Sequence, residues 1–378
     1  MADGARQSTG WFHSYISHRP PVQLKTSAPV DDEVFAAIEY VSEIPSVGHS
    51  FLKSAGVPRP KAAFESFRAF IRQGKAFYEA ASHLHYRAAP LMYYYAFLNL
   101  AKAYITTREP TFVRGPVQHG LGQTSSSKKL VHETIRVPVT PGVFHKLYEI
   151  ETHQPLRVPI RLNVATLLGY CTDVGYEYGR AGYGASRLLP VKARFLSHQA
   201  SRITWPALAF LGYEELKPFK KALRPFHNYF QVAKPASHLM RDTFGIFAEE
   251  RPHYTFVESK ITYPWAEDGT VDLSQIRRDV LSACASLHES PIYDDGFDFS
   301  LALPLRRNLQ IPFNQPLAVY AAMFYVGSLV RYRPAYLERT LQSKDAWMIE
   351  RFVRGAPTTF LRYIGNAILG TDYLYGAR

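Results

Sequence analysis

The segment PLMYYYAFLNLAKAYI, residues 90–105, decides the fold class of this chain. It is apolar on almost every side, and Asn99 and Lys102 are its only strongly polar side chains. A helix that is apolar all round must be buried by other elements, so we predict the central helix of a helical layer. Pro90 fits the first turn of this helix, where an amide would have no intrahelical partner.

Helical patterns precede this segment. The acidic residues 31–33 favour a helix start, and apolar residues follow them at helical spacing. Pro60 suits the first position of a second helix, whose apolar face continues to about Ser82. The N-terminal region is therefore expected to be helical.

The C-terminal part of the chain shows the same pattern. Asn314 is expected to cap an apolar helix that ends before Pro334. Its apolar run, 316–330, is shorter than the roughly 20 residues needed to cross a bilayer, so we expect a buried core helix. One further helix is expected over 336–353 and a separate short helix over 358–369.

The middle of the chain has a different composition. Residues 108–129 are rich in Pro, Gly, Ser and Lys and predict a long loop, whereas segments 132–144 and 251–265 predict short antiparallel strands. We therefore expect a mainly α fold of the α+β class, with a helical core and a smaller β-containing region. Its expected regions are an N-terminal helical region (1–108), a mixed middle (109–271) and a C-terminal helical region that packs on the N-terminal helices (272–378).

The composition favours a globular protein with an anionic partner. Hydrophobic residues make up 47% and charged residues 20% of the 378 residues, which excludes disorder over most of the chain. Lysine and arginine number 44 against 32 aspartates and glutamates, so the formal net charge is +12. This basic excess favours RNA or DNA as the partner.

Cofactor and targeting signals are weak. Cys171 and Cys284 lack the spacing of a zinc site, and the sequence contains neither a phosphate-binding loop nor a complete dinucleotide motif, so no metal or cofactor is expected. The first residues lack the apolar core of a signal peptide. We therefore expect a cytoplasmic protein without a membrane partner.

Asn99 and Lys102 are the first candidate site residues. They are three positions apart, so they share one face of an otherwise apolar helix, and a buried amide or ammonium needs a partner. In a purely structural interpretation, Asn99 bonds a neighbouring backbone group and Lys102 extends along its own stem to water. In a functional interpretation, the pair binds a ligand.

His119 is the second candidate. It lies in Gln118-His119-Gly120-Leu121-Gly122, where the glycines permit tight turns and the close approach of another group. Such a histidine could act as an acid, a base or a phosphate ligand. The alternative is an ordinary loop histidine.

Arg331, Tyr332 and Arg333 end the apolar C-terminal helix. Their guanidinium groups suit phosphate, and the tyrosine between them could stack a base. Alternatively, the arginines complement the helix dipole.

Arg180, Tyr183 and Arg187 form a further candidate group. Aromatic residues, arginines and glycines alternate in this stretch, as they do on surfaces that bind single-stranded nucleic acid. Flexible surface loops have the same composition, so that interpretation stays open.

Several of these blocks together resemble one protein family. Trp11, the segment 90–105, His119-Gly120-Leu121 and FYVGSLVRYRP (324–334) are similar to the YaaC-like family of prokaryotic proteins. The YYAFLNLAKA block also resembles the core helix of the HEPN superfamily. That resemblance implies an all-α core, pairing of protomers and a role around nucleic acid, since many HEPN members are RNases of toxin–antitoxin or anti-phage systems.

The sequence departs from the catalytic pattern of active HEPN RNases. In those enzymes four to six residues separate an arginine from a histidine on a helix, and both Arg114 with His119 and Arg6 with His13 match this spacing, as about three pairs would by chance. Gly115 and Pro116 lie between Arg114 and His119 and oppose a helix, so the standard HEPN active site is not expected. Asp242, Glu258 and Lys260 loosely imitate a metal-dependent nuclease, which is a weaker alternative.

These observations lead to three hypotheses. The first is a binding or regulatory protein that contacts nucleic acid or a protein partner in a prokaryotic multi-gene defence or stress system, with the option of homo-oligomers. Its expected site joins Asn99, Lys102, His119, Arg331 and Arg333. The second is a metal-independent endoribonuclease in which His119 is acid or base and Lys102, Arg331 or Arg333 stabilises the phosphate charge. The third gives the same residues a structural role.

Overall fold

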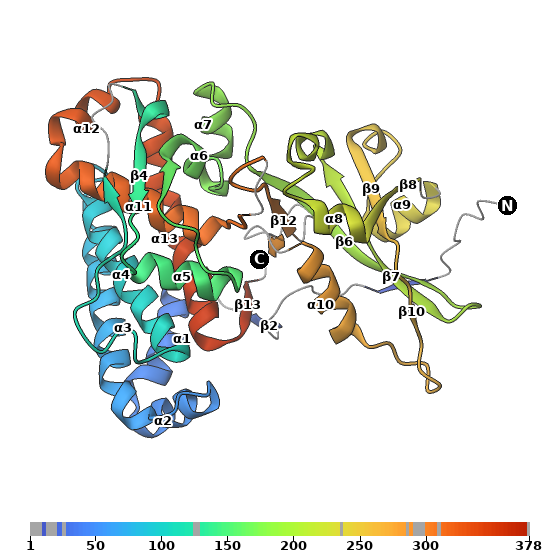
Figure 1. Cartoon of the computed structure of the whole chain (residues 1–378), viewed down its shortest axis with the longest axis horizontal. Helices are drawn as coiled ribbons and strands as arrows, with labels where there is room; N and C mark the ends of the chain where they lie inside the picture. Colours follow the sequence, from blue (N-terminus) through green and yellow to red (C-terminus); the bar gives the residue numbers. More distant parts are fainter. Residues whose placement is uncertain are drawn as a thin grey trace. The chain divides into compact units, whose positions relative to one another are not determined.

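The computed structural model divides the chain into two compact units (Figure 1). The helical unit comprises Lys25–Arg187 and Asn314–Tyr373, and the sheet unit comprises Met1–Leu24, Leu188–Phe313 and Leu374–Arg378. The structure describes residues 10–12, 21–24, 28–123, 129–234, 237–284, 287–289, 299–307 and 311–375.

The unit boundaries differ from the three consecutive regions that the sequence predicts. Residues 109–187 join the helical unit, because α5 (Val143–Thr152) packs on α4 (Ala89–Arg108) and on α11 (Gln315–Tyr332). Conversely, α10 (Leu273–Ala283) packs on the sheet instead of on the N-terminal helices. The α+β class is confirmed, and the sheet is built from segments beyond the middle region.

The helical unit contains three kinds of element. Its remaining helices are α1 (Val30–Glu43), α2 (Pro45–Ser54), α3 (Pro60–Ser82), α6 (Val164–Leu168), α7 (Gly175–Arg180), α12 (Pro334–Thr340) and α13 (Ala346–Leu369). A small antiparallel sheet has the order β3 (Gly122–Gln123), β4 (Thr134–Val137), β5 (Ile160–Asn163). Short 3-10 helices include Leu130–His132 and Thr172–Val174.

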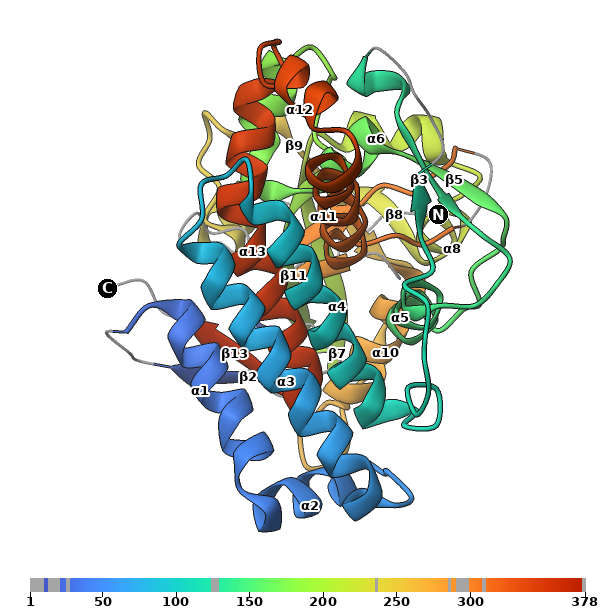
Figure 2. The same cartoon turned by 90° about the vertical axis from the view of Figure 1, so that its left-hand side faces the viewer.

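α4 is the central helix of this unit, as predicted. α3, α11 and α13 all pack against it, and Figure 2 shows α3 and α4 side by side. The ring of Phe97 stacks on Phe360 of α13 with centroids 4.1 Å apart, and the ring of Tyr94 meets Phe324 of α11 edge-on at 5.3 Å. Aromatic pairs in such geometries stabilise a core beyond the area that they bury.

α11 also confirms its prediction. The side chain of Asn314 accepts a hydrogen bond from the Leu317 amide at 3.0 Å, and the helix ends at Tyr332, two residues before Pro334. It is buried from Gln315 to Leu329. Among the residues that the structure describes, no helix combines the length and apolar character that a membrane crossing requires.

The last two helices are divided at a different place from the one predicted. Residues 336–340 lie in α12, and α13 is continuous over residues 346–369, where we expected a break between 353 and 358. It runs through Pro357, which is buried inside it. A proline removes one backbone hydrogen bond and is unfavourable inside a helix. The apolar face on both sides of Pro357, including Phe352 and Phe360, is buried against other helices, and this packing offsets the lost bond.

A polar contact joins α1, α3 and α13 inside the unit. The Tyr78 hydroxyl donates to Asp31 Oδ2 at 2.6 Å, and the Thr358 hydroxyl donates to the same oxygen at 3.0 Å. Desolvation and the negative charge of Asp31 raise the pKa of Tyr78, which keeps the phenol protonated as the donor. Asp31 at the start of α1 therefore connects α3 and α13 through one carboxylate oxygen.

The sheet unit is built on long antiparallel strands. Its strands are β1 (Gly10–Phe12), β6 (Leu188–His198), β7 (Ile203–Leu211), β8 (Phe230–Ala233), β9 (Tyr254–Ser259), β10 (Tyr263–Pro264), β11 (Leu287–Glu289) and β12 (Phe299–Ala302). The order is β11-β12-β6-β7-β9-β8, with β1 on β6 and β10 on β7. Short strands β2 (Pro21–Leu24) and β13 (Asp372–Tyr375) lie near the chain ends.

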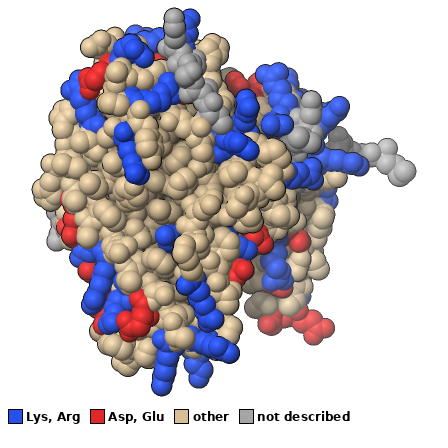
Figure 3. Space-filling model, turned by 60° about the vertical axis from the view of Figure 1, so that its left-hand side comes forward, with Lys and Arg blue, Asp and Glu red and all other residues tan. Residues whose placement is uncertain are grey.

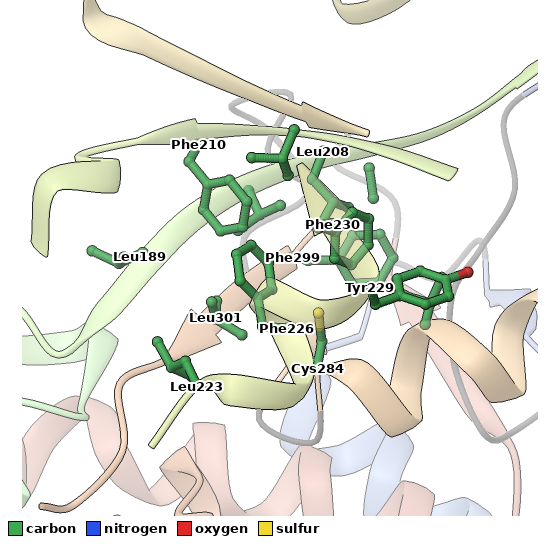
Figure 4. Close-up of a cluster of buried hydrophobic side chains, with 14 of the residues drawn as sticks. Leu189, Leu208, Phe210, Leu223, Phe226, Tyr229, Phe230, Cys284, Phe299 and Leu301 are labelled. Carbon is green, nitrogen blue, oxygen red and sulfur yellow. The ribbon is translucent and has the colours of Figure 1, made fainter. Parts of the chain in front are cut away.

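Helices cover both faces of this sheet. On one face, α8 (Arg224–Tyr229) and α10 pack on alternate residues of β6 and β7, and Figure 4 shows Phe210, Phe226 and Phe299 converging there. On the other face, Trp205 packs with Phe244 of α9 (Ser237–Phe244). Successive residues of a strand point to opposite faces of the sheet. Both faces of β7 are apolar because helices cover both.

Gly48 lets α2 approach α3 closely. A Cβ atom at this position would lie 2.1 Å from Cε2 of the Phe64 ring, and Phe64 is fully buried. We expect Gly48→Ala to lower the free energy of unfolding by about 1–3 kcal/mol, because the ring cannot move without disturbing the core. Urea unfolding measures this loss. The exposed Ser46→Ala in the same helix is the control, and an unchanged midpoint for Gly48→Ala would contradict the packing described.

Candidate anion-binding site

The candidate site lies along one face of α4. Tyr95, Asn99 and Lys102 are spaced four and three residues apart, so they occupy the same side of the helix. The amide of Asn99 donates to the Tyr95 carbonyl at 2.9 Å, and Asn99 is buried. Asn99 therefore bonds a backbone group of its own helix, as the purely structural interpretation predicts.

Lys102 has no such partner. Its ammonium lies 5.5 Å from the centroid of the Phe70 ring of α3, and burial lowers its pKa. Across the described residues, no carboxylate forms an ion pair with Lys102. A partly desolvated cation over an aromatic face is stabilised by the ring but keeps its capacity to bind an anion.

A cavity of about 410 Å³ opens at Lys102. One wall is Phe70, and the other is the chain that follows α4, from Val113 through Gly115 and Pro116 to Gln118. This size is within the range of small-ligand pockets, about 300–1,000 Å³. The cavity therefore offers room for a ligand group next to the ammonium.

The loop that carries His119 is anchored through its backbone. The carbonyl of Gln118 accepts from the Val143 amide at 2.9 Å, and that of His119 accepts from the Phe144 amide at 3.1 Å. Gly120 has a φ of +77°, and a Cβ atom on Gly142 would lie 2.5 Å from Gly120 Cα. Both glycines are required for this approach, so the loop is fixed on the start of α5 instead of being flexible.

The ring of His119 packs beside aromatic residues of two helices. It lies 5.3 Å from Phe324 of α11 and 6.3 Å from Tyr94 of α4, measured between ring centroids. Burial lowers the pKa of His119, and the positive charge of Lys102 lowers it further. The imidazole is therefore neutral at pH 7, and the two candidate side chains are close enough to interact.

A backbone contact orients this ring: the Leu121 amide donates to His119 Nδ1 at 3.4 Å, which is a long hydrogen bond. A neutral imidazole carries one N–H group, which can donate to an acceptor. Lys102 and His119 thus present donor groups, which suit a phosphate or carboxylate oxygen.

Arg331 joins the same helix face, whereas Arg333 does not. Arg331 donates to the Tyr95 hydroxyl at 3.1 Å, and its guanidinium lies 4.9 Å from the centroid of the exposed Tyr332 ring. Arg333 instead pairs with Glu133, at 3.0 Å from Nη1 to Oε2. Glu133 is fully buried, so this ion pair has a structural role. The sequence had instead predicted Arg333 in one shared site with Lys102.

The third predicted group lies elsewhere in the helical unit. The Tyr183 hydroxyl donates to Asp345 at 2.7 Å, and the Lys344 ammonium lies over its ring at 5.3 Å. The Arg187 guanidinium lies 5.1 Å from the centroid of the Tyr170 ring, and Arg180 is exposed at the end of α7. These contacts attach the stretch to the start of α13 and to the core.

The alternative catalytic arrangements receive no support from their surroundings. Arg114 and His119 lie in a non-helical stretch, as Gly115 and Pro116 predict. In the sheet unit, Asp242 pairs with Arg241 at 2.7 Å, and Lys260 donates to the His227 carbonyl at 2.7 Å. Within the described ranges, no group of three His, Cys, Asp or Glu side chains could hold a metal ion.

Sequence reasoning missed the aromatic partners of the site. Phe70, Tyr94 and Phe324 come from three different helices, and Tyr95 connects Asn99 to Arg331. Tyr94 and Tyr95 lie within the segment that decides the fold, so their spacing from Lys102 was a usable signal. No local signal indicated Phe70.

The chain has an α+β fold, and its helical unit places a partly desolvated lysine, Lys102, beside a cavity. The chain belongs to the YaaC-like protein family, whose model matches residues 46–368. No curated protein matches the chain, and no solved structure matches it.

The ion pair between Arg333 and Glu133 gives a stability prediction. Arg333→Ala would leave a buried carboxylate without its cation, so we expect a loss of about 3 kcal/mol or more in the free energy of unfolding. Chemical denaturation measures it. Arg331→Ala, which removes an exposed arginine two residues away, should cost less than about 1 kcal/mol. Equal effects of the two substitutions would show that the Glu133 pair does not stabilise the fold.

Proposed function

We propose that this protein binds nucleic acid through the α4 face, with a phosphate held by Lys102 and His119. The observation that carries the proposal is the partly buried ammonium of Lys102, which borders a cavity and has no carboxylate partner among the described residues. A phosphate oxygen would supply the missing negative charge. The formal net charge of +12 would attract a polyanion to this surface.

The groups along α4 suit a strand with both phosphates and bases. Tyr95 and Lys102 are seven residues apart, which corresponds to about 10.5 Å along a helix. Arg331 lies at the Tyr95 end, and the exposed ring of Tyr332 beside it could stack a base. This arrangement supports single-stranded RNA or DNA as the ligand.

The resemblance of the α4 segment to the HEPN core helix supports nucleic acid as the partner and a prokaryotic defence or stress system as the setting. We place the protein there as a binding or regulatory component.

The first test removes the cation at the cavity. Lys102→Gln should weaken binding of a single-stranded RNA at low salt by at least about tenfold, because a hydrogen bond to a charged group contributes about 1.5–3 kcal/mol. Fluorescence anisotropy measures the affinity, and the exposed Arg161→Gln removes the same charge as a control. Equal losses in the two variants, or no binding by the unaltered protein, would favour a protein partner instead.

The second test uses the depressed pKa of His119. A bound phosphate favours the protonated ring, so affinity should rise as the pH falls from about 7.5 to about 5.5. His119→Gln should remove this rise. In the protein without ligand, the pH dependence of stability has the opposite sign. The pKa of His119 is lower in the folded than in the unfolded state, so the unfolded state binds more protons, and the free energy of unfolding falls as the pH drops below about 6.5. Affinity that is independent of pH would exclude His119 from the site.

Endoribonuclease activity is the second candidate, because His119 is accessible and lies close to a cation. We expect no RNA cleavage by the purified protein. Cleavage that persists in EDTA and disappears in His119→Ala, with binding retained, would replace the binding proposal by this one.

A further inference from the structure

A second cavity of the helical unit lies where α2 leads into α3. Its volume is about 470 Å³, and Lys53, Arg59 and Lys61 form part of its wall. Figure 3 shows lysine and arginine side chains gathered at the lower end of the view, over α2 and the start of α3. None of these residues belongs to the α4 site.

The cations of this cavity differ from those further along α3. In the described part of the chain, Lys53, Arg59 and Lys61 form no ion pair with a carboxylate. The later cations of α3 each pair with a glutamate: Arg68 with Glu65 at 2.6 Å, Arg72 with Glu43 at 2.5 Å and Lys75 with Glu39 at 2.7 Å. Positive charge is therefore neutralised along the body of α3 and left uncompensated at the cavity.

The start of α3 adds to this charge. Its first turn contains no acidic residue, whereas the first turn of α1 contains three. The N-cap residue Arg59 makes no side-chain capping bond, and Lys61 follows it at the positive end of the helix dipole. Cations at this end repel the dipole, and a bound anion would relieve that repulsion.

The rest of the cavity wall is less polar. Pro60 and Ala62 contribute to it, as does His49, whose ring packs edge-on against Phe64 with centroids 4.9 Å apart. A flat ring fits against such a wall, while the charged ends of Lys53, Arg59 and Lys61 can reach phosphates at its edge. The cavity thus combines a surface for a base with a cluster of cations.

We propose that this cavity binds a nucleoside polyphosphate through its phosphate chain and base. A phosphodiester strand brings about one negative charge per nucleotide, whereas a triphosphate concentrates several charges within one nucleotide. Three uncompensated cations around one cavity of nucleotide size match the triphosphate. A free nucleotide and the 5′-triphosphate end of an RNA share this chemistry.

The test is calorimetric titration of the full chain with ATP, ADP, AMP and inorganic triphosphate in EDTA. ATP should bind more tightly than ADP, and ADP more tightly than AMP. The double variant R59Q/K61Q should weaken ATP binding by at least about tenfold. The double variant R157Q/R161Q removes the same charge at exposed positions, and Lys102→Gln removes the α4 cation, so both should retain ATP binding.

A matched pair of RNA oligonucleotides, with 5′-triphosphate or 5′-hydroxyl ends, separates the two sources. Tighter binding of the triphosphorylated RNA, lost in R59Q/K61Q, identifies an RNA end, and ATP binding without that gain identifies the free nucleotide. Equal affinity for ATP and AMP, or an equal loss in the two double variants, would overturn the proposal. Binding of inorganic triphosphate as tight as that of ATP would overturn the role of the base. These outcomes do not test nucleic-acid binding at the α4 face, which depends on Lys102.

Discussion

The burial of α4 on all sides is the constraint on which the helical unit depends. α3, α11 and α13 must surround this helix, and their packing leaves room for only a few polar groups along it. Asn99 is satisfied by the backbone of its own helix, so it adds no charge to the interior. Lys102 is different, because the same packing partly desolvates it and no carboxylate of the described residues pairs with its ammonium. The site is a direct consequence of how the fold buries its central helix.

Local patterns were sufficient to predict the helices that begin and end at strong signals. Pro60 and Pro334 mark helix boundaries through their backbone chemistry and Asn314 through its capping side chain, and the structure confirms each of them. The continuous α13 was not predictable, because the packing that holds Pro357 in a helix comes from distant segments. The long strands β6 and β7 were missed for a related reason. Lys192 and Arg194 break the apolar pattern of β6, yet both are buried and bond the carbonyls of Phe244 and Thr243.

The candidate site was predictable in part. Lys102 and His119 are unusual polar residues in apolar or glycine-rich surroundings, and the structure brings them close enough for the charge of Lys102 to lower the pKa of His119. The partner of Arg333 was not predictable, because Glu133 lies 200 residues away in the sequence. The place of Phe70 in the cavity wall was not predictable either, because it depends on how α3 packs on α4. Sequence identifies which side chains need partners, and the tertiary fold decides which of them receive one.

The most direct test of this account is the pKa of the Lys102 amine, measured by NMR on the protein with isotope-labelled lysines, with and without a single-stranded RNA. The account predicts a pKa below the ordinary value of about 10.5 in the free protein, because burial disfavours the charged form. It also predicts a rise when the RNA binds, because a phosphate stabilises the ammonium. An ordinary pKa that does not change with RNA would contradict the claim that Lys102 is a desolvated cation that binds a phosphate.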